Sequence, residues 1–124
     1  MIRCVTLLAA FAVLPAFAQA PRNFTAKTLR GEIVIVQPPE VRLNGDPARL
    51  APGARIRDQN NLIQLSGALV NQRFVVNYTR DLSGNVLDVW VLTPQERARQ
   101  PWPSNAADAA AWRFNAATQA WSKP

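Results

Sequence analysis

Arginine is the residue type in this sequence that offers the most chemistry, because Arg49, Arg55 and Arg57 fall within nine residues around a Pro-Gly pair. Guanidinium groups bind carboxylates and phosphates through paired hydrogen bonds. On a strand that begins after Gly53, alternation sends Arg55 and Arg57 to one face and Ile56 to the other. Arg49 precedes the Pro-Gly pair and cannot be assigned to that face. The segment predicts either part of an anion site or a solvated strand face.

A wider hypothesis is that the protein binds anionic envelope material, such as lipopolysaccharide or phospholipid headgroups, by electrostatic attraction. It requires the basic residues to converge on one side of the folded chain, and the binding would weaken with salt. The candidate anion- or partner-binding residues are Arg42, Arg49, Arg55, Arg57, Arg73 and Arg80.

Catalysis is limited by two absences: the sequence has no histidine, and Cys4 is its only cysteine. There is then no Ser-His-Asp arrangement, no imidazole base and no ordinary zinc site. A hydrolase could still use two carboxylates. The spacing of the candidates in the sequence does not indicate a catalytic pair among Glu32, Glu40, Asp46, Asp58, Asp81 and Asp88. Glycine-rich phosphate loops are also absent. We therefore expect no enzymatic activity, no cofactor and no metal, with a carboxylate-only hydrolase as the remote alternative.

Aromatic residues offer a second kind of contact, since Trp102, Trp112 and Trp121 recur at intervals of ten and nine residues and Trp90 lies in an expected strand. One interpretation is a contact surface for sugars or peptides. The interpretation that we favour is packing, because each ring buries a large apolar area.

A strand face that carries aromatic residues could bind nucleic acid by stacking on its bases. The candidate segment for such a face is 73–78. Alternation places Phe74, Val76 and Tyr78 on one face and Arg73 on the other. The aromatic side chains then point inward, away from the basic residue, so we expect no nucleic-acid partner.

The N-terminal residues have the anatomy of a secretory signal peptide. Arg3 supplies a short positive region, an apolar run follows at 5–14, and small residues come next. Two A-x-A motifs compete, ending at Ala18 and Ala20. Cleavage after Ala20 would place Pro21 at the scissile bond, which is unfavourable, so we expect cleavage after Ala18. The apolar run is shorter than the roughly 20 residues that span a bilayer, so no transmembrane anchor is expected.

Removal of residues 1–18, or of 1–20 in the alternative, changes the composition of the chain. Without Cys4 the mature protein has no cysteine, and without Arg3 it carries 13 Lys and Arg against 8 Asp and Glu, a formal charge of +5. No disulfide is expected, and about 100 residues can form a single domain on its core alone. These features favour a bacterial periplasmic, or else extracellular, location.

The segment 24–93 has the pattern of a small β domain, with short apolar and β-branched runs separated by turn residues. The expected strands are 31–36, 41–43, 54–58, 62–65, 73–79 and 86–92. They predict a mainly β fold: a small antiparallel barrel of five or six strands, OB-like or SH3-like, with one or two short C-terminal helices. An open meander covered by the C-terminal segment is the alternative.

Turn residues indicate where some of these strands begin and end. Asn44-Gly45 is the strongest hairpin signal in the sequence. Pro47 cannot donate a backbone hydrogen bond, so the strand that follows it should be short or at an edge. Ala51–Ala54 has Pro and Gly where a type II turn needs them, and a new strand should begin there.

The segment 94–124 is rich in Ala, Pro and Trp and should pack on the barrel. Thr93 and Glu96 have the spacing of a capping box, with Pro94 at the first helical position. Ser104 can cap a second helix. The expected elements are short helices to about Gln100 and Ala111 and a final small hairpin over 112–121.

Several stretches together resemble a family of small uncharacterised exported proteins of proteobacteria. They are Leu29-Arg-Gly-Glu, Val41-x-Leu-Asn-Gly-x-Pro-x-Arg-Leu-x-Pro-Gly-x-Arg-Ile-Arg57, Ser66-Gly-Ala-Leu69 and Val89-Trp-Val-Leu-Thr-Pro94. The resemblance implies export and a single domain, and it transfers no activity, ligand or catalytic residue.

Two functional hypotheses follow. The first is a non-enzymatic periplasmic binding or structural module of the cell envelope, which predicts a contiguous apolar or aromatic patch for an unidentified protein or envelope partner. The second is the electrostatic binder described above.

Overall fold

The computed structural model describes residues 21–124, so the predicted signal peptide, its two cleavage sites and Cys4 lie outside the described residues. In chain order the elements are β1 (Leu29–Gln37), β2 (Glu40–Leu43), β3 (Asp46–Arg57), β4 (Ile63–Gln64), the short 3-10 helix η1 (Ser66–Leu69), β5 (Arg73–Arg80), β6 (Val86–Val91), α1 (Pro94–Arg97), α2 (Ala106–Ala111), β7 (Arg113–Asn115) and β8 (Ala120–Ser122).

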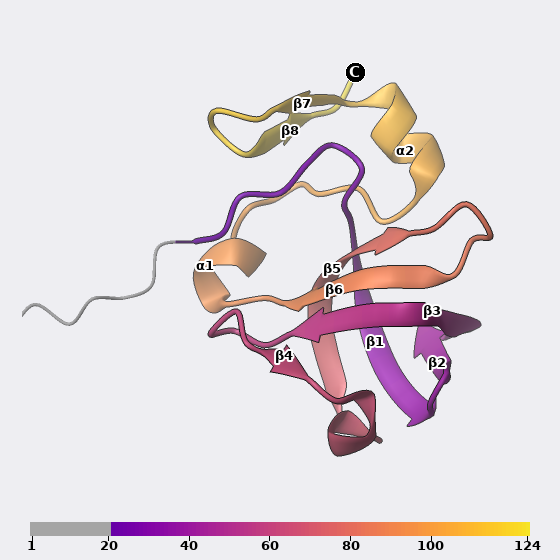
Figure 1. Ribbon diagram of the computed structural model, residues 1–124. Helices are drawn as coiled ribbons and strands as arrows, with labels where there is room; N and C mark the ends of the chain where they lie inside the picture. The colour runs from indigo at the N-terminus through magenta and orange to yellow at the C-terminus, as the bar shows by residue number, and fades with distance from the viewer. Residues whose placement is uncertain (1–20) are drawn as a thin grey trace, which may run out of the picture.

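Five strands close into a barrel in the order β1-β2-β3-β6-β5, and β5 pairs back with β1 (Figure 1). The short strand β4 adds to β3. The predicted small β-barrel with short C-terminal helices is therefore confirmed, with five strands in its ring.

The prediction that all strands are antiparallel is wrong at one pair, because β3 and β6 run parallel, with Arg57 beside Trp90. The reason is geometric. A ring of five strands cannot alternate in direction all the way round, so one neighbouring pair must be parallel when the other four pairs are antiparallel.

The strand after the first hairpin is longer than predicted. Asn44 and Gly45 have φ values of 53° and 83°, as a type I′ hairpin turn requires. The following strand, β3, is not short but spans twelve residues. Pro47 is tolerated because β3 has a partner strand on only one side there, where Pro47 faces Arg42 of β2 and pairing with β6 has not yet begun.

The Pro52-Gly53 pair bends β3 instead of ending it. Gly53 has a φ of 78°, as expected for a turn glycine. Between Leu50 and Arg55 the register with β6 shifts, since five steps along β3 correspond to only two along β6, from Val86 to Asp88. The expected new strand is therefore the second half of β3, after a bulge.

The remaining strand predictions differ in their outcome. The hairpin of β5 and β6 is confirmed, whereas the strand expected at 62–65 is reduced to Ile63–Gln64. Alternation on β5 is as predicted, because Val76 and Tyr78 are buried and Phe74 packs against the same cluster. The barrel core consists of Leu29, Ile33, Ile35, Val41, Leu43, Leu50, Ile56, Val76, Tyr78, Val86 and Val89.

The C-terminal segment folds as two short helices and a hairpin. The capping box of Thr93 and Glu96 is confirmed, but α1 ends at Arg97, before Gln100. The second helix is capped by Asn105, whose side chain accepts from the Asp108 amide, and not by Ser104. The final hairpin, β7–β8, is confirmed. Among residues 21–124, no helix is long and apolar enough to cross a membrane.

A second core lies between this segment, the outer face of the barrel and residues 21–28, which run beneath the β7–β8 hairpin (Figure 1). Phe24 packs edge-on against Trp90 at 5.4 Å and Trp102 at 5.9 Å between ring centroids. Trp102 and Trp121 are buried, while Trp90 and Trp112 are half-buried beside them. The packing interpretation is confirmed for Trp102 and Trp121, which are 7% and 5% exposed, whereas Trp90 and Trp112 keep part of their surface exposed.

A buried ion pair joins the start of the described chain to helix α1. The Arg22 guanidinium donates to both carboxylate oxygens of Glu96, at 3.0 and 2.8 Å, and the Glu96 side chain is fully buried. Burial alone would raise the pKa of Glu96, but hydrogen bonds from the Arg22 side chain, the Thr93 amide and the Arg22 amide lower that pKa to about 2.

We predict that Glu96→Gln lowers the free energy of unfolding at pH 7, and that the difference from wild type closes on acidification. The carboxylate stabilises the fold above its ordinary pKa of 4.5, and this contribution, on the order of 3 kcal/mol, is lost as the pH falls toward 2. Glutamine preserves the capping box. Urea unfolding at several pH values measures the difference.

The control is Glu40→Gln, which breaks the exposed ion pair with Arg49 and should cost less than about 1 kcal/mol. A Glu96→Gln deficit that stays constant between pH 7 and pH 2 would contradict the assignment.

Candidate functional site: an uncharged groove beside β3

The connection from β3 to β5 is shaped by one carboxylate. Asp58 Oδ1 accepts from the backbone N–H groups of Asn60 and Leu62, at 2.9 and 3.0 Å, and Oδ2 accepts from the Gln64 side chain at 2.8 Å. The hydrogen bond from Leu62, followed by those from Asn60 and Gln64, lowers the pKa of the Asp58 carboxyl. Because these bonds hold the turn at 60–62, the next residues project in a fixed direction.

Those next residues are apolar and exposed. Ile63 and Leu65 have 62% and 80% of their surface exposed, and Leu62 before them has 61%. In Figure 1, β4 and the helix that follows it lie at the end of the barrel away from β7, β8 and α2. An apolar surface is therefore presented on the part of the barrel that the C-terminal segment leaves uncovered.

A groove of about 430 Å³ runs beside these side chains. Its lining consists of Pro38, Pro39, Leu50, Ala51, Gly53, Ala54, Ile56, Ile63, Gln64, Leu65 and Ser66. None of them carries a charge, and Leu50 and Ile56 at its floor belong to the barrel core. The lining thus combines apolar side chains with the polar groups of Gln64, Ser66 and the backbone, and it has no charged group to hold an ion.

The groove exists because β3 lacks a neighbour over part of its length. Pairing with β2 ends at Arg49, and pairing with β4 begins at Ile56. Residues 51–54 between them have no paired strand on either side. The bulge at Pro52-Gly53 and the interval between β2 and β4 thus produce the groove together.

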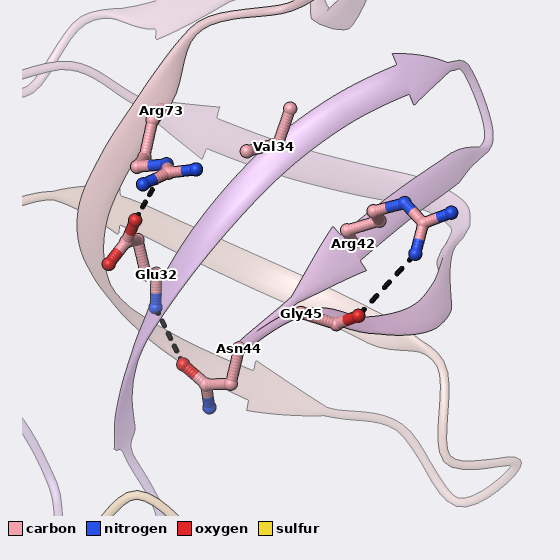
Figure 2. Close-up of a pocket in the computed structure, with 6 residues that line it drawn as sticks. All are labelled: Glu32, Val34, Arg42, Asn44, Gly45 and Arg73. Carbon is pink, nitrogen blue, oxygen red and sulfur yellow. Dashed lines mark hydrogen bonds and ion pairs between the residues drawn. The ribbon is translucent and has the colours of Figure 1, made fainter.

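The arginines predicted from the sequence do not gather at this groove. Arg42 and Arg73 lie on the strands on either side of β1, and both pair in register with Val34. They flank a shallow pocket of about 380 Å³, shown in Figure 2. There Arg73 lies beside Glu32, at 2.8 Å, and Arg42 turns toward the carbonyl of Gly45.

The other four candidate arginines lie elsewhere on the barrel. Arg55 and Arg57 share a face, as predicted, and both contact Asp88, at 3.4 and 3.3 Å. Arg49 pairs with Glu40. Arg80 donates to the carbonyl of Gly84 at the far end of β5. Two pairs of these arginines lie close together, Arg42 with Arg73 and Arg55 with Arg57. Each of the six is near an acceptor within the protein.

The candidate carboxylates are also engaged locally. Glu32, Glu40 and Asp88 contact arginines, while Asp58 and Asp81 accept from backbone amides of their own turns. Over residues 21–124, no three side chains of the metal-binding types cluster.

Comparison with known proteins adds no relationship: no family model, no curated protein and no solved structure matches the chain. The resemblance to small exported proteins of proteobacteria therefore stays a prediction.

Sequence reasoning missed the groove. It assigned Leu62–Leu65 to a strand, although the apolar residues there do not alternate strictly. That irregularity, between an Asn-Asn pair and Ser66-Gly67, is the signal in the sequence that the apolar side chains here do not form one buried strand face.

The bulge that shapes the groove depends on Gly53, and we predict that Gly53→Ala costs about 1–2 kcal/mol of unfolding free energy. A Cβ there meets no atom within 4 Å, so the cost arises from the backbone φ of 78°. Gly67→Ala is the matched control, since its Cβ also meets nothing and its φ is not positive. Urea unfolding of both variants measures the difference, and equal stabilities would contradict a conformational role for Gly53.

Proposed function

We propose that the protein is an exported, non-enzymatic binding module of the bacterial envelope, and that a protein partner docks apolar side chains into the groove beside β3. The observation that carries this proposal is the exposure of Ile63 and Leu65 next to an uncharged hollow. Burying one such side chain in a complex contributes about 1.5–3 kcal/mol, so a few of them can sustain a specific contact.

Several exposed apolar side chains lie close together at this groove, which distinguishes it from a surface with a single exposed apolar residue. Leu82 is fully exposed as well, but it lies alone in the turn between β5 and β6. Single exposed apolar residues are common on soluble proteins, whereas a group beside a groove is typical of an interaction site.

Export is supported by the sequence of residues 1–20, with its positive start, apolar run and small residues before Ala18 and Ala20. The absence of cysteine from the remaining chain is consistent with a periplasmic protein that is stabilised by its core. The resemblance to small exported proteins points the same way.

A non-enzymatic role is supported by the chemistry that the chain offers. Histidine is absent, and five of the six candidate carboxylates are held by arginines or by turn amides. The electrostatic alternative has less support than apolar docking, because each of the six arginines already lies near an acceptor within the protein.

Leu65→Asp tests this proposal. The mature protein is immobilised and used to capture partners from an envelope extract at low and high salt. We predict a partner that wild type retains at high salt and that the variant binds at least about tenfold more weakly, because an unpaired carboxylate would be buried in an apolar contact.

The matched control is Leu82→Asp, which places the same charge on an isolated exposed position and should bind like wild type. Both variants should keep the wild-type unfolding free energy within about 0.5 kcal/mol. A partner lost from wild type at high salt would favour the electrostatic alternative, and equal binding by both variants would exclude the groove.

A further inference from the structure

A second hollow lies at one end of the barrel and has a volume of about 370 Å³. Its lining consists of Asp58, Gln59, Asn60, Gln64, Leu69, Phe74 and Val91. Three of these residues lie two positions from a core residue, so strand alternation turns them inward: Asp58 after Ile56, Phe74 before Val76 and Val91 after Val89. The hollow is therefore the mouth of the barrel, a common place for binding sites in barrel folds.

The floor of the barrel mouth is apolar. Leu69, Phe74 and Val91 are half-buried and pack against the barrel core. Each methylene group that leaves water at such a surface contributes about 0.8 kcal/mol. An aromatic ring such as that of Phe74 also attracts cations. The floor thus fits an aliphatic stem.

Among the described residues that line the mouth, Asp58 is the only charged one. Its Oδ1 accepts from two backbone N–H groups, whereas Oδ2 accepts from the Gln64 side chain. Because a carboxylate oxygen can accept two hydrogen bonds, Oδ2 has room for one more donor. The hydrogen bond from Leu62 and its neighbours lower the pKa of this carboxyl, so it is ionised at neutral pH. Arg22 donates to the Asp58 carbonyl, and its own charge is paired with Glu96.

We propose that the barrel mouth is a binding site for a cation on an apolar stem, and that it receives a lysine or arginine side chain of the partner that docks at the groove. The source of that side chain rests on the proposed function. A neutral apolar ligand would strip water from Asp58 without replacing it, and an anion would be repelled. A cation on an aliphatic stem satisfies both the carboxylate and the floor.

The mouth and the groove are continuous, because Gln64 of β4 lines both. The exposed residues on either side of it, Ile63 and Leu65, belong to the groove. One segment of a partner can therefore place an apolar side chain in the groove and a basic side chain in the mouth. Since the described lining of the groove carries no charge, the two hollows select different side chains and together restrict which partners fit.

The test titrates the mature protein at neutral pH with n-pentylammonium, which reproduces the stem and the charge of a lysine side chain. The ligands n-pentanol and pentanoate supply the same stem with no charge and with the opposite charge. Backbone amide NMR signals of residues 58–64 report binding at the mouth. We expect n-pentylammonium to bind with a Kd on the order of 1–10 mM, and both other ligands to bind at least about fivefold more weakly.

Asp58→Asn removes the charge and keeps an oxygen that can accept from the turn amides, and it should weaken n-pentylammonium binding at least about fivefold. The matched control is Asp81→Asn, which should bind like wild type. Asp81 Oδ1 accepts from the backbone N–H groups of Ser83 and Asn85, as Asp58 Oδ1 does in its own turn, but Asp81 does not line the mouth. If Asp58→Asn disturbs the turn, the comparison of the three ligands on wild type decides.

In the capture experiment, Asp58→Asn should weaken retention of the partner at least about fivefold. Binding of n-pentanol as tight as that of n-pentylammonium would overturn the inference and leave the groove standing. So would a partner that Leu65→Asp loses and Asp58→Asn retains unchanged. Selective n-pentylammonium binding, together with unchanged capture by Leu65→Asp, would support the cation site and exclude the groove.

Discussion

Closure of a ring with an odd number of strands is the constraint on which the rest of this structure depends. One pair must be parallel, and β3 and β6 form it. To reach both β2 and β6, β3 has to be long and has to bend, which it does at Pro52-Gly53. The bend leaves residues 51–54 without a paired strand, so the same feature that closes the barrel also opens the uncharged groove.

Charged side chains and aromatic packing attach the C-terminal segment to the barrel. Residues 21–124 contain no cysteine, so no disulfide contributes to this attachment. Arg30 of β1 donates to the carbonyls of Glu96 and Arg99 and lies over the Trp102 ring at 5.0 Å. Burial and the charge of Arg99 lower the pKa of Arg30 to about 10. Together with the Arg22–Glu96 pair, these contacts join the first and last parts of the described chain.

Sequence patterns predicted the features that are determined locally. The Asn44-Gly45 turn, the capping box at Thr93 and the shared face of Arg55 and Arg57 depend on residues within a few positions of one another. On that face both arginines contact Asp88.

The features that the sequence did not predict depend on distant partners. Arg22 had no visible role, because its partner Glu96 is 74 residues away. The parallel pair required knowledge of how the ring closes, and the groove required knowledge of where β2 ends and β4 begins. The spacing of the tryptophans did not decide between packing and a contact surface, because the contact of Phe24 with Trp90 and Trp102 joins residues far apart in the sequence.

We propose that the groove beside β3 binds a protein partner in the envelope. Its most direct test is photo-crosslinking in living cells, with a photoreactive amino acid at position 65 or, as the reference, at position 82. We predict one discrete crosslinked species from position 65 and none from position 82. Identical products from the two positions, or a product from position 82 alone, would contradict it.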